Sequence, residues 1–217
     1  MSIRFTKSPA TYVQDSSVSF TTPVTLSFSV YIDDPTSDTF PFLINLVEAS
    51  TGYRFGCLYA LSLDSIRPRY DMAEGGSADN LIGSASEKWI DICLVAYDTS
   101  YDGWVNGSQI LDGEAYGGSR TFSGVTFDRF ELGGYSNSEL DGYMANVGLW
   151  NTSITDDQAK SLSNGFIPTI VRPQDLELYI SETQSTYADA LQNISLSAPV
   201  SEPTFDNSFN PFLIFPE

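Results

Sequence analysis

The stretch LDGYMANVGLWNTSITDDQAKSL, residues 140–162, changes its periodicity halfway along. Its first half alternates apolar residues with small or polar ones, which is the pattern of a strand with one buried face. Thr155 then offers a helix N-cap, and Gln158 three residues later completes a capping box. Gly165 is a natural stop beyond the C-terminal end of such a helix. We therefore expect a strand that leads directly into one short helix over about 155–164.

Short strands separated by Gly, Asn, Asp, Ser and Pro are predicted through most of the remaining chain. In VTLSFSVYID (24–33) apolar residues recur at every second position, so one face of this strand is expected to be buried. The dipeptide Asn106-Gly107 is a strong signal for a two-residue hairpin turn, because both positions tolerate positive φ. Further strands are expected within 40–50, 53–63, 88–98, 101–110 and 127–135. The first two of these are expected to form a hairpin around Ser50-Thr51-Gly52.

The residues after Gly165 differ in character from those before it. Their apolar clusters are short and are separated by prolines, so they cannot build a core of their own. We expect one sandwich domain over 1–165. The residues 166–217 are predicted to form a strand-rich C-terminal extension that docks on the sandwich or on a neighbouring subunit.

The charge of the chain limits its partners. The 217 residues include 10 Lys and Arg against 28 Asp and Glu, which gives a net charge of −18. Such a chain repels the phosphates of nucleic acids and anionic membrane surfaces, so we expect neither as a partner. The N-terminal MSIRFTKSPATYVQ has no apolar region of the kind that a secretory signal contains, and no signal is expected.

The content of histidine and cysteine narrows the possible chemistry. The chain has no His, which excludes Ser-His-Asp and Cys-His catalysis and the usual zinc sites. Only Cys57 and Cys93 are present, and both lie in apolar strand-like segments. Buried free thiols are favoured over a disulfide, although the sequence leaves both open.

Three segments together resemble the laminin-G-like, concanavalin A-like jelly roll. They are VTLSFSVYID (24–33), KWIDICLVAYDTSYDGWVNGSQI (88–110) and the opening stretch 140–162. Trp104 stands where that family commonly has Tyr, and Ile90-Asp91 replaces its usual residues beside the first Trp. The resemblance covers about 20–165 and implies an all-β, concanavalin A-like jelly-roll β-sandwich. It also implies that the short helix packs under the end of the sandwich, as a feature of the fold.

A second resemblance concerns the segment NGFIPTIVRPQDLELYI, residues 164–180. Its Gly165, Pro168, Arg172-Pro173 and Leu176–Ile180 resemble the ending of jelly-roll proteins from bacteriophage genomes. This implies a non-enzymatic structural protein of a phage particle, either a capsid decoration or a tail- or fibre-associated adhesion module. The implied location is the virion, assembled in the host cytoplasm. The implied partners are other virion proteins, as a homo-oligomer or bound to capsid or tail subunits.

The alternative function is a carbohydrate-binding module that recognises a host-surface polysaccharide. Such binding needs exposed aromatic rings for stacking, with polar groups nearby for the hydroxyls. The candidates in or beside predicted loops are Tyr101, Trp104, Tyr116 and Tyr135. Packing of these rings against the sandwich is the competing interpretation for each.

Acidic residues in two predicted loops are candidates for a calcium site, and no other cofactor is expected. Rims of laminin-G-like domains often bind Ca²⁺ through Asp side chains and carbonyl oxygens. The first cluster contains Asp33, Asp34 and Asp38, and the second contains Asp98 and Asp102. Neither has the spacing of an EF-hand, and Asp is also common in turns because it bonds its own backbone.

Hydrolysis of a glycosidic bond is the enzymatic alternative, because related jelly rolls include glycoside hydrolases. Retaining hydrolysis requires two carboxyl groups about 5–5.5 Å apart. The nearest stretches are SELDGY, with Glu139 and Asp141, and QDLELY, with Asp175 and Glu177. Each offers two acids without a third on the same strand, and solvated carboxylates explain them equally well. We expect no enzymatic activity.

Overall fold

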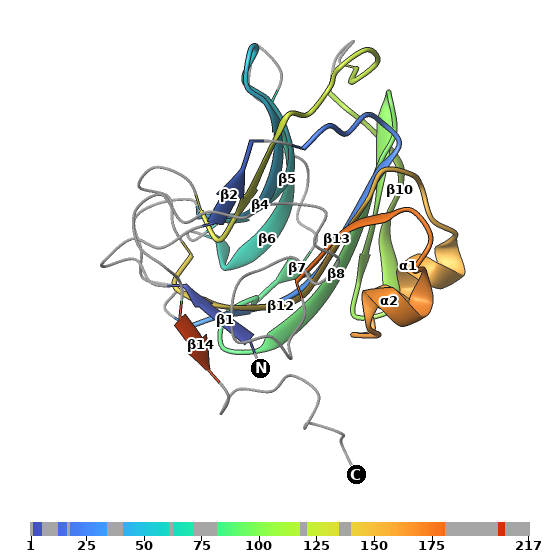
Figure 1. The fold of residues 1–217 in the computed structure, drawn as a ribbon. Helices are drawn as coiled ribbons and strands as arrows, with labels where there is room; N and C mark the ends of the chain where they lie inside the picture. Colours follow the sequence, from blue (N-terminus) through green and yellow to red (C-terminus); the bar gives the residue numbers. More distant parts are fainter. Residues whose placement is uncertain are drawn as a thin grey trace.

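The computed structural model shows two antiparallel β-sheets that pack face to face as a jelly-roll β-sandwich (Figure 1). It describes residues 2–5, 13–16, 18–33, 41–60, 63–71, 82–117, 121–134, 140–180 and 204–206. The fold class predicted from the sequence is confirmed. None of the helices in these ranges has the length and apolar character needed to cross a bilayer.

The larger sheet has eight strands among the described residues, and its long strands β8 and β12 are strongly curved (Figure 1). Strand β12 is central, because it pairs with β3 along one edge and with both β1 and β13 along the other. In spatial order the strands are β10 (Ser108–Ala115), β9 (Ser100–Val105), β8 (Trp89–Ala96), β3 (Val24–Ile32), β12 (Gly142–Trp150), β1 (Ser2–Phe5) and β14 (Thr204–Asp206), with β13 (Leu176–Ile180) beside β12.

The smaller sheet has six strands within the same described ranges. Their spatial order is β2 (Val13–Asp15), β11 (Arg129–Leu132), β4 (Phe42–Glu48), β5 (Tyr53–Ala60), β6 (Ser65–Asp71) and β7 (Ile82–Gly83). Strands β1, β2, β6 and β7 were not expected from the sequence pattern. They are short or interrupted by polar residues, and they depend on neighbouring strands for their hydrogen bonds.

Both predicted hairpins are present. Strands β4 and β5 pair around the turn at 49–52, and β9 and β10 pair around Asn106 and Gly107. These two turn residues have φ values of 47° and 76°, which is the left-handed conformation that the dipeptide predicts.

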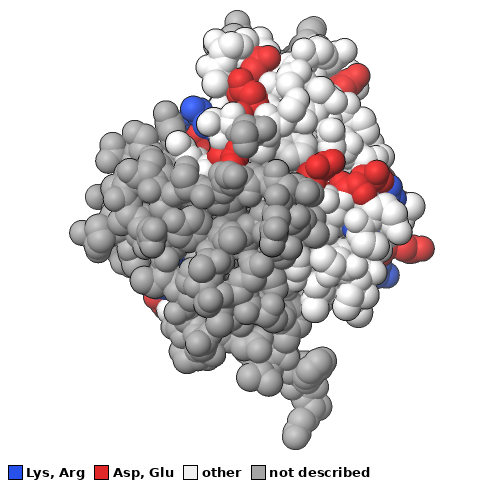
Figure 2. All heavy atoms as spheres, in the orientation of Figure 1, with Lys and Arg blue, Asp and Glu red and all other residues white. Residues whose placement is uncertain are grey.

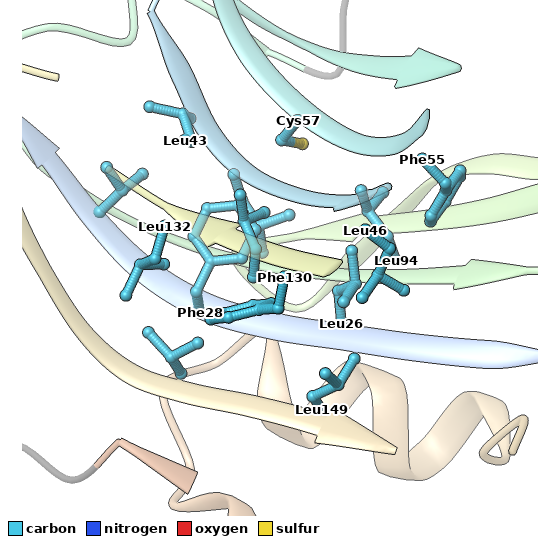
Figure 3. Packing of buried hydrophobic residues seen from close by; sticks show 14 of the residues in the cluster. Leu26, Phe28, Leu43, Leu46, Phe55, Cys57, Leu94, Phe130, Leu132 and Leu149 are labelled. Carbon is cyan, nitrogen blue, oxygen red and sulfur yellow. The ribbon is translucent and has the colours of Figure 1, made fainter. Parts of the chain in front are cut away.

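The main core lies between the two sheets and is built by the alternate residues of each strand. Figure 3 shows Leu26, Phe28 and Leu94 of the larger sheet facing Leu46 and Phe130 of the smaller one. All of these side chains are essentially inaccessible to solvent. The period-two pattern in 24–33 therefore predicted which residues face this core. The expectation of a single buried face was wrong, because Thr25, Ser27 and Ser29 on the opposite face of β3 are buried as well.

Two helices cover part of the outer face of the larger sheet (Figure 1). Helix α1 (Asp156–Leu162) begins at Thr155, whose side chain accepts a hydrogen bond from the Gln158 backbone. The Gln158 side chain in turn accepts from the Thr155 backbone, so the predicted capping box is confirmed. The buried Ala159 and Leu162 of α1 pack against outward-facing residues of the sheet, among them Trp150.

The segment after Gly165 contributes directly to the larger sheet. It begins with the short helix α2 (Pro168–Val171), which was not expected, and continues into β13 beside β12. The more distant β14 pairs with β1. The predicted boundary at 165 stays a prediction, although four of the five residues of β13 are buried and the strand contacts both β12 and α2.

The two cysteines lie in different hydrophobic clusters. Cys57 belongs to the core between the sheets, whereas Cys93 belongs to the cluster beneath the helices. Both thiols are free and buried, and burial raises the pKa of each well above its usual value. The interpretation as buried free thiols is therefore confirmed.

Candidate functional site

Three of the four aromatic residues predicted to stack on sugars are buried. Tyr101 and Tyr116 lie in the core between the sheets, with their rings stacked at a centroid distance of 5.4 Å. Trp104 faces outward from β9 but is covered by helix α1. The exposed fractions of the three residues are 3%, 1% and 2%, so they lack the open ring faces that stacking requires. Tyr135 lies outside the described residues.

Tyr101 and Trp104 lie in β9, within the strand expected at 101–110, and Tyr116 directly follows β10, which continues beyond that range to Ala115. Tyr101 is the second residue of β9, so its ring points inward like the other alternate residues of that strand. The Tyr116 hydroxyl donates to the Tyr97 carbonyl at 3.1 Å, which satisfies the polar end of a ring in an apolar cluster. Packing, the competing interpretation, describes all three rings.

The acidic residues predicted to bind calcium do not converge where they are described. Asp33 forms an ion pair with Arg4, and its neighbours Asp34 and Asp38 lie outside the described residues. Asp98 accepts a hydrogen bond from the Thr22 hydroxyl, while Asp102 accepts from the Gly113 amide at 2.5 Å. Within the described residues no group of three or more Asp, Glu or Cys side chains could hold a metal ion.

The two stretches that carry the carboxylates considered for catalysis lie at opposite ends of β12. Asp141 precedes β12, whereas Asp175 precedes β13, whose residue Leu176 pairs with the far end of β12 at Trp150. Strand β12 has nine residues. Its two ends are therefore roughly 25 Å apart along the strand. Asp175 is held in an ion pair with Arg172 at 2.9 Å. Glu139 lies outside the described residues.

The structure instead brings together a row of aromatic side chains on the outer face of the larger sheet. Tyr31 of β3 is in register with Trp89 of β8 on one side and with Tyr143 of β12 on the other. We call Trp89, Tyr31 and Tyr143 the aromatic row. All three are half-buried, in contrast to the fully buried rings of the core.

The rings of the aromatic row support one another. The centroids of Tyr31 and Trp89 are 5.9 Å apart, and those of Tyr31 and Tyr143 are 6.1 Å apart. The ring planes are inclined at 54° and 72°, which is the tilted to edge-on arrangement that aromatic quadrupoles favour. Each pair adds about 1 kcal/mol to the burial of the rings, so the row is held in a defined geometry.

Arg4 continues the row onto β1, where it is in register with Tyr143. Its guanidinium carbon lies 4.8 Å from the centre of the Tyr143 ring. Its Nη2 atom lies 2.6 Å from Asp141 Oδ1 and 3.1 Å from Asp33 Oδ2. Its Nη1 atom donates to the carbonyls of Phe5 and Gly142. Arg4 therefore anchors the row and is held by four oxygen acceptors of the protein itself.

A second polar group lies two residues along β8 from Trp89, on the same face. Asp91 accepts a hydrogen bond from the Ser29 hydroxyl of β3. Burial raises the pKa of this carboxyl to about 6, and the Ser29 hydrogen bond only partly offsets that rise. Carboxylates therefore lie on both sides of the row, with Asp91 on one side and Asp33 and Asp141 on the other.

This arrangement has the composition of a ligand site. Aromatic surface supplies apolar contact, and a few fixed polar groups supply direction. The larger sheet has its strands about 4.8 Å apart, so a row across four strands from Trp89 to Arg4 spans about 14 Å. That is the length of a short oligosaccharide.

The sequence contains part of the signal for this row. The alternation in 24–33 and 88–98 already assigns Tyr31 and Trp89 to outward faces. The missing information was the register, because only the pairing of β8, β3, β12 and β1 sets Trp89, Tyr31, Tyr143 and Arg4 side by side.

The described surface carries many more acids than bases. Figure 2 shows Asp and Glu at several separate places on the visible face and few Lys or Arg between them. This agrees with the net charge of −18. Any ligand approaches a strongly negative protein.

Comparison with known proteins identifies the fold of the chain. A scan against protein-family models finds no match. A search of curated proteins likewise finds none that is similar to the chain. Solved structures do match, but at identities that show the fold alone. A heptameric SAP-like pentraxin from Limulus polyphemus matches with a TM-score of 0.63 and 10% identity, over 95% of this chain and 94% of the pentraxin.

The descriptions of two further matches refer to carbohydrates. A candidate carbohydrate-binding protein from Bacteroides ovatus has a TM-score of 0.58 and 15% identity, over 94% of this chain and 60% of that chain. Domain 4 of AbnA, a GH43 extracellular arabinanase from Geobacillus stearothermophilus seen with arabinotriose, has a TM-score of 0.54 and 11% identity, over 69% of each chain. The chain also spans about a quarter of the sialidase of Trypanosoma rangeli, at 24% of its length. All are similar to this chain in fold.

Proposed function

We propose that this protein is a non-catalytic carbohydrate-binding protein whose ligand lies across the aromatic row. The row carries the proposal, because it joins three half-buried rings with carboxylates on both sides. The apolar C–H faces of a sugar pack well on aromatic rings, and its hydroxyls donate to carboxylates. The fold neighbours named for carbohydrates support this function over the virion role.

The virion role implied by the C-terminal segment stays a prediction. None of the neighbours described above is named as a virion component. The predicted location in a virion therefore also stays a prediction. The predicted homo-oligomer is a separate question, which light scattering of the purified chain would answer. Calcium binding stays a prediction as well.

The proposal is tested by screening the full chain against a panel of polysaccharides and following its fluorescence. The sequence has three Trp, of which Trp104 and Trp150 are buried and Trp89 is half-buried. A ligand that stacks on the row should therefore shield Trp89 from acrylamide and leave the other two unchanged. In Trp89→Phe the ligand-induced change should disappear.

Variants separate binding from folding. Trp89→Ala should weaken binding about tenfold or more, because truncation of a central aromatic contact typically costs more than 1.4 kcal/mol. Phe166→Ala is the matched control, since Phe166 is 57% exposed and precedes α2, away from the row. It should bind like the unmodified protein. Equal affinity of Trp89→Ala and Phe166→Ala, or no binding to any glycan, would overturn the proposal.

A further inference from the structure

The charged groups around the aromatic row are mostly acidic. Among the described residues, Asp33 follows Tyr31 by two positions and Asp141 precedes Tyr143 by two positions. Asp91 follows Trp89 by two positions. Glu87, also exposed, precedes Trp89 by two residues, and its amide donates to the Ile32 carbonyl at the end of β3. Three carboxyl groups therefore flank the three rings, and the exposed Glu87 lies nearby in the sequence.

The two cations near the row do not balance these acids. Arg4 is 19% exposed and donates to two backbone carbonyls as well as contacting Asp33 and Asp141. A ligand carboxylate would have to displace one of these partners, and in doing so would leave it without its cation. Lys88 is exposed and lies just before the first residue of β8.

The exposed acids are suited to accept hydrogen bonds from hydroxyl groups. The Asp33 side chain is 48% exposed and that of Asp141 is 25% exposed, so each keeps carboxylate surface beside the row. Ionised carboxylates are acceptors only, and a sugar hydroxyl is a donor that matches them. A second carboxylate or a sulfate in the same position would meet like charge, because the Arg4 donors nearby already bind Asp33, Asp141 and two backbone carbonyls.

We propose, on the basis of the proposed function, that the aromatic row selects uncharged glycans and rejects those that carry carboxylate or sulfate groups. The net charge of −18 acts in the same direction, because it lowers the local concentration of anionic polymers around the whole molecule. The half-buried Asp91 adds to the local effect, since an anion placed over it faces a charge that is only partly screened by solvent.

Matched polymer pairs test this selection directly. Methyl-esterified and de-esterified polygalacturonan share one backbone and differ in charge. Unsubstituted and glucuronic-acid-substituted xylan, and agarose and a sulfated galactan, form two further pairs. Affinity electrophoresis and fluorescence titration should show binding to the uncharged member of at least one pair. The affinity for its charged counterpart should be lower by about tenfold or more. A like-charge contact costs several kcal/mol, and 1.4 kcal/mol is tenfold.

Salt provides a second readout on the same pairs. Affinity for the uncharged polymer should change less than about twofold between low salt and about 0.15 M salt, where charges are screened beyond roughly 8 Å. Residual binding to the charged polymer should become tighter as salt rises. Weakening with salt would mean that cations of the protein attract the ligand, which would overturn the inference.

Two variants assign the effect to the row. Asp33→Asn should reduce the ratio of affinities for the uncharged and charged polymers at least threefold, because it removes an exposed carboxylate beside the row while keeping an acceptor. Asp112→Asn on β10 makes the same change in net charge at an exposed position on another strand, and should leave the preference unchanged. Equal effects of both would show that net charge alone selects the ligand.

The two proposals fail in different ways. Binding to glycans with equal or higher affinity for the charged members would overturn the selection and leave the carbohydrate-binding function standing. Failure of every polysaccharide to bind would overturn the carbohydrate-binding function, and the selection with it.

Discussion

Asp91 makes the free energy of unfolding depend on pH in a direction that is unusual for an acid. Its carboxyl is buried beside the aromatic row and accepts a hydrogen bond from Ser29. Burial raises its pKa from 3.8 to about 6. A folded-state pKa above the unfolded value means that the folded protein binds this proton more tightly. The contribution of Asp91 to stability is therefore full below about pH 4 and is lost as the pH rises through about 6.

The size of this effect follows from the shift. Two pKa units correspond to roughly 3 kcal/mol, and the partial exposure of Asp91 reduces this to about 2 kcal/mol. Asp91→Asn keeps an oxygen that accepts from Ser29 and removes the charge. At pH 7 the variant should be more stable than the unmodified protein by about 2 kcal/mol. At pH 4 the two should agree within about 0.5 kcal/mol.

Urea unfolding followed by circular dichroism at several pH values between 4 and 7 measures this difference. With a typical m-value, about 2 kcal/mol shifts the midpoint by roughly 1 M urea. Asp112→Asn, at an exposed position on β10, is the control for the change in net charge and should shift stability by less than about 0.5 kcal/mol at every pH. A difference between Asp91→Asn and the unmodified protein that does not grow with pH, or a less stable variant at pH 7, would refute the reasoning.

Three further predictions concern the fold. Thr155→Ala removes the N-cap of α1 and should lower the free energy of unfolding, measured in urea titrations, by about 1 kcal/mol. An unchanged free energy of unfolding would show that the capping box does not stabilise the protein. Gly56→Ala should destabilise by more than about 2 kcal/mol, because its Cβ would lie 1.9 Å from the Ile44 carbonyl oxygen; an unchanged melting temperature would contradict this close approach. Cys57 and Cys93 should resist a thiol reagent in the folded protein and react fully in urea, whereas rapid reaction without denaturant would show that one of them is accessible.

The helix and its neighbouring strand were predictable because their signals are local. The capping box joins Thr155 to Gln158, three residues away, and the turn at Asn106 and Gly107 depends on two residues. Period-two alternation likewise acts within one strand, and it identified the residues of β3 and β8 that face the main core. Such features need no knowledge of the rest of the chain.

The candidate site was not predictable in the same way. Tyr101, Trp104 and Tyr116 lie near loops in the sequence, but inward alternation and the cover of α1 bury them. The short strands β1 and β14 also lack a local signal, since their hydrogen bonds come from partners more than a hundred residues away.

The sequence by itself determined the all-β class, the hairpin turns, the capped helix and the strongly negative charge, because each depends on neighbouring residues or on composition. Only the tertiary structure decided which aromatic residues reach the surface together. Trp89, Tyr31, Tyr143 and Arg4 come from four strands, and the pairing of those strands places them in one row. The register of a sheet is set by contacts between distant segments, so a site built across strands exists only in the folded chain.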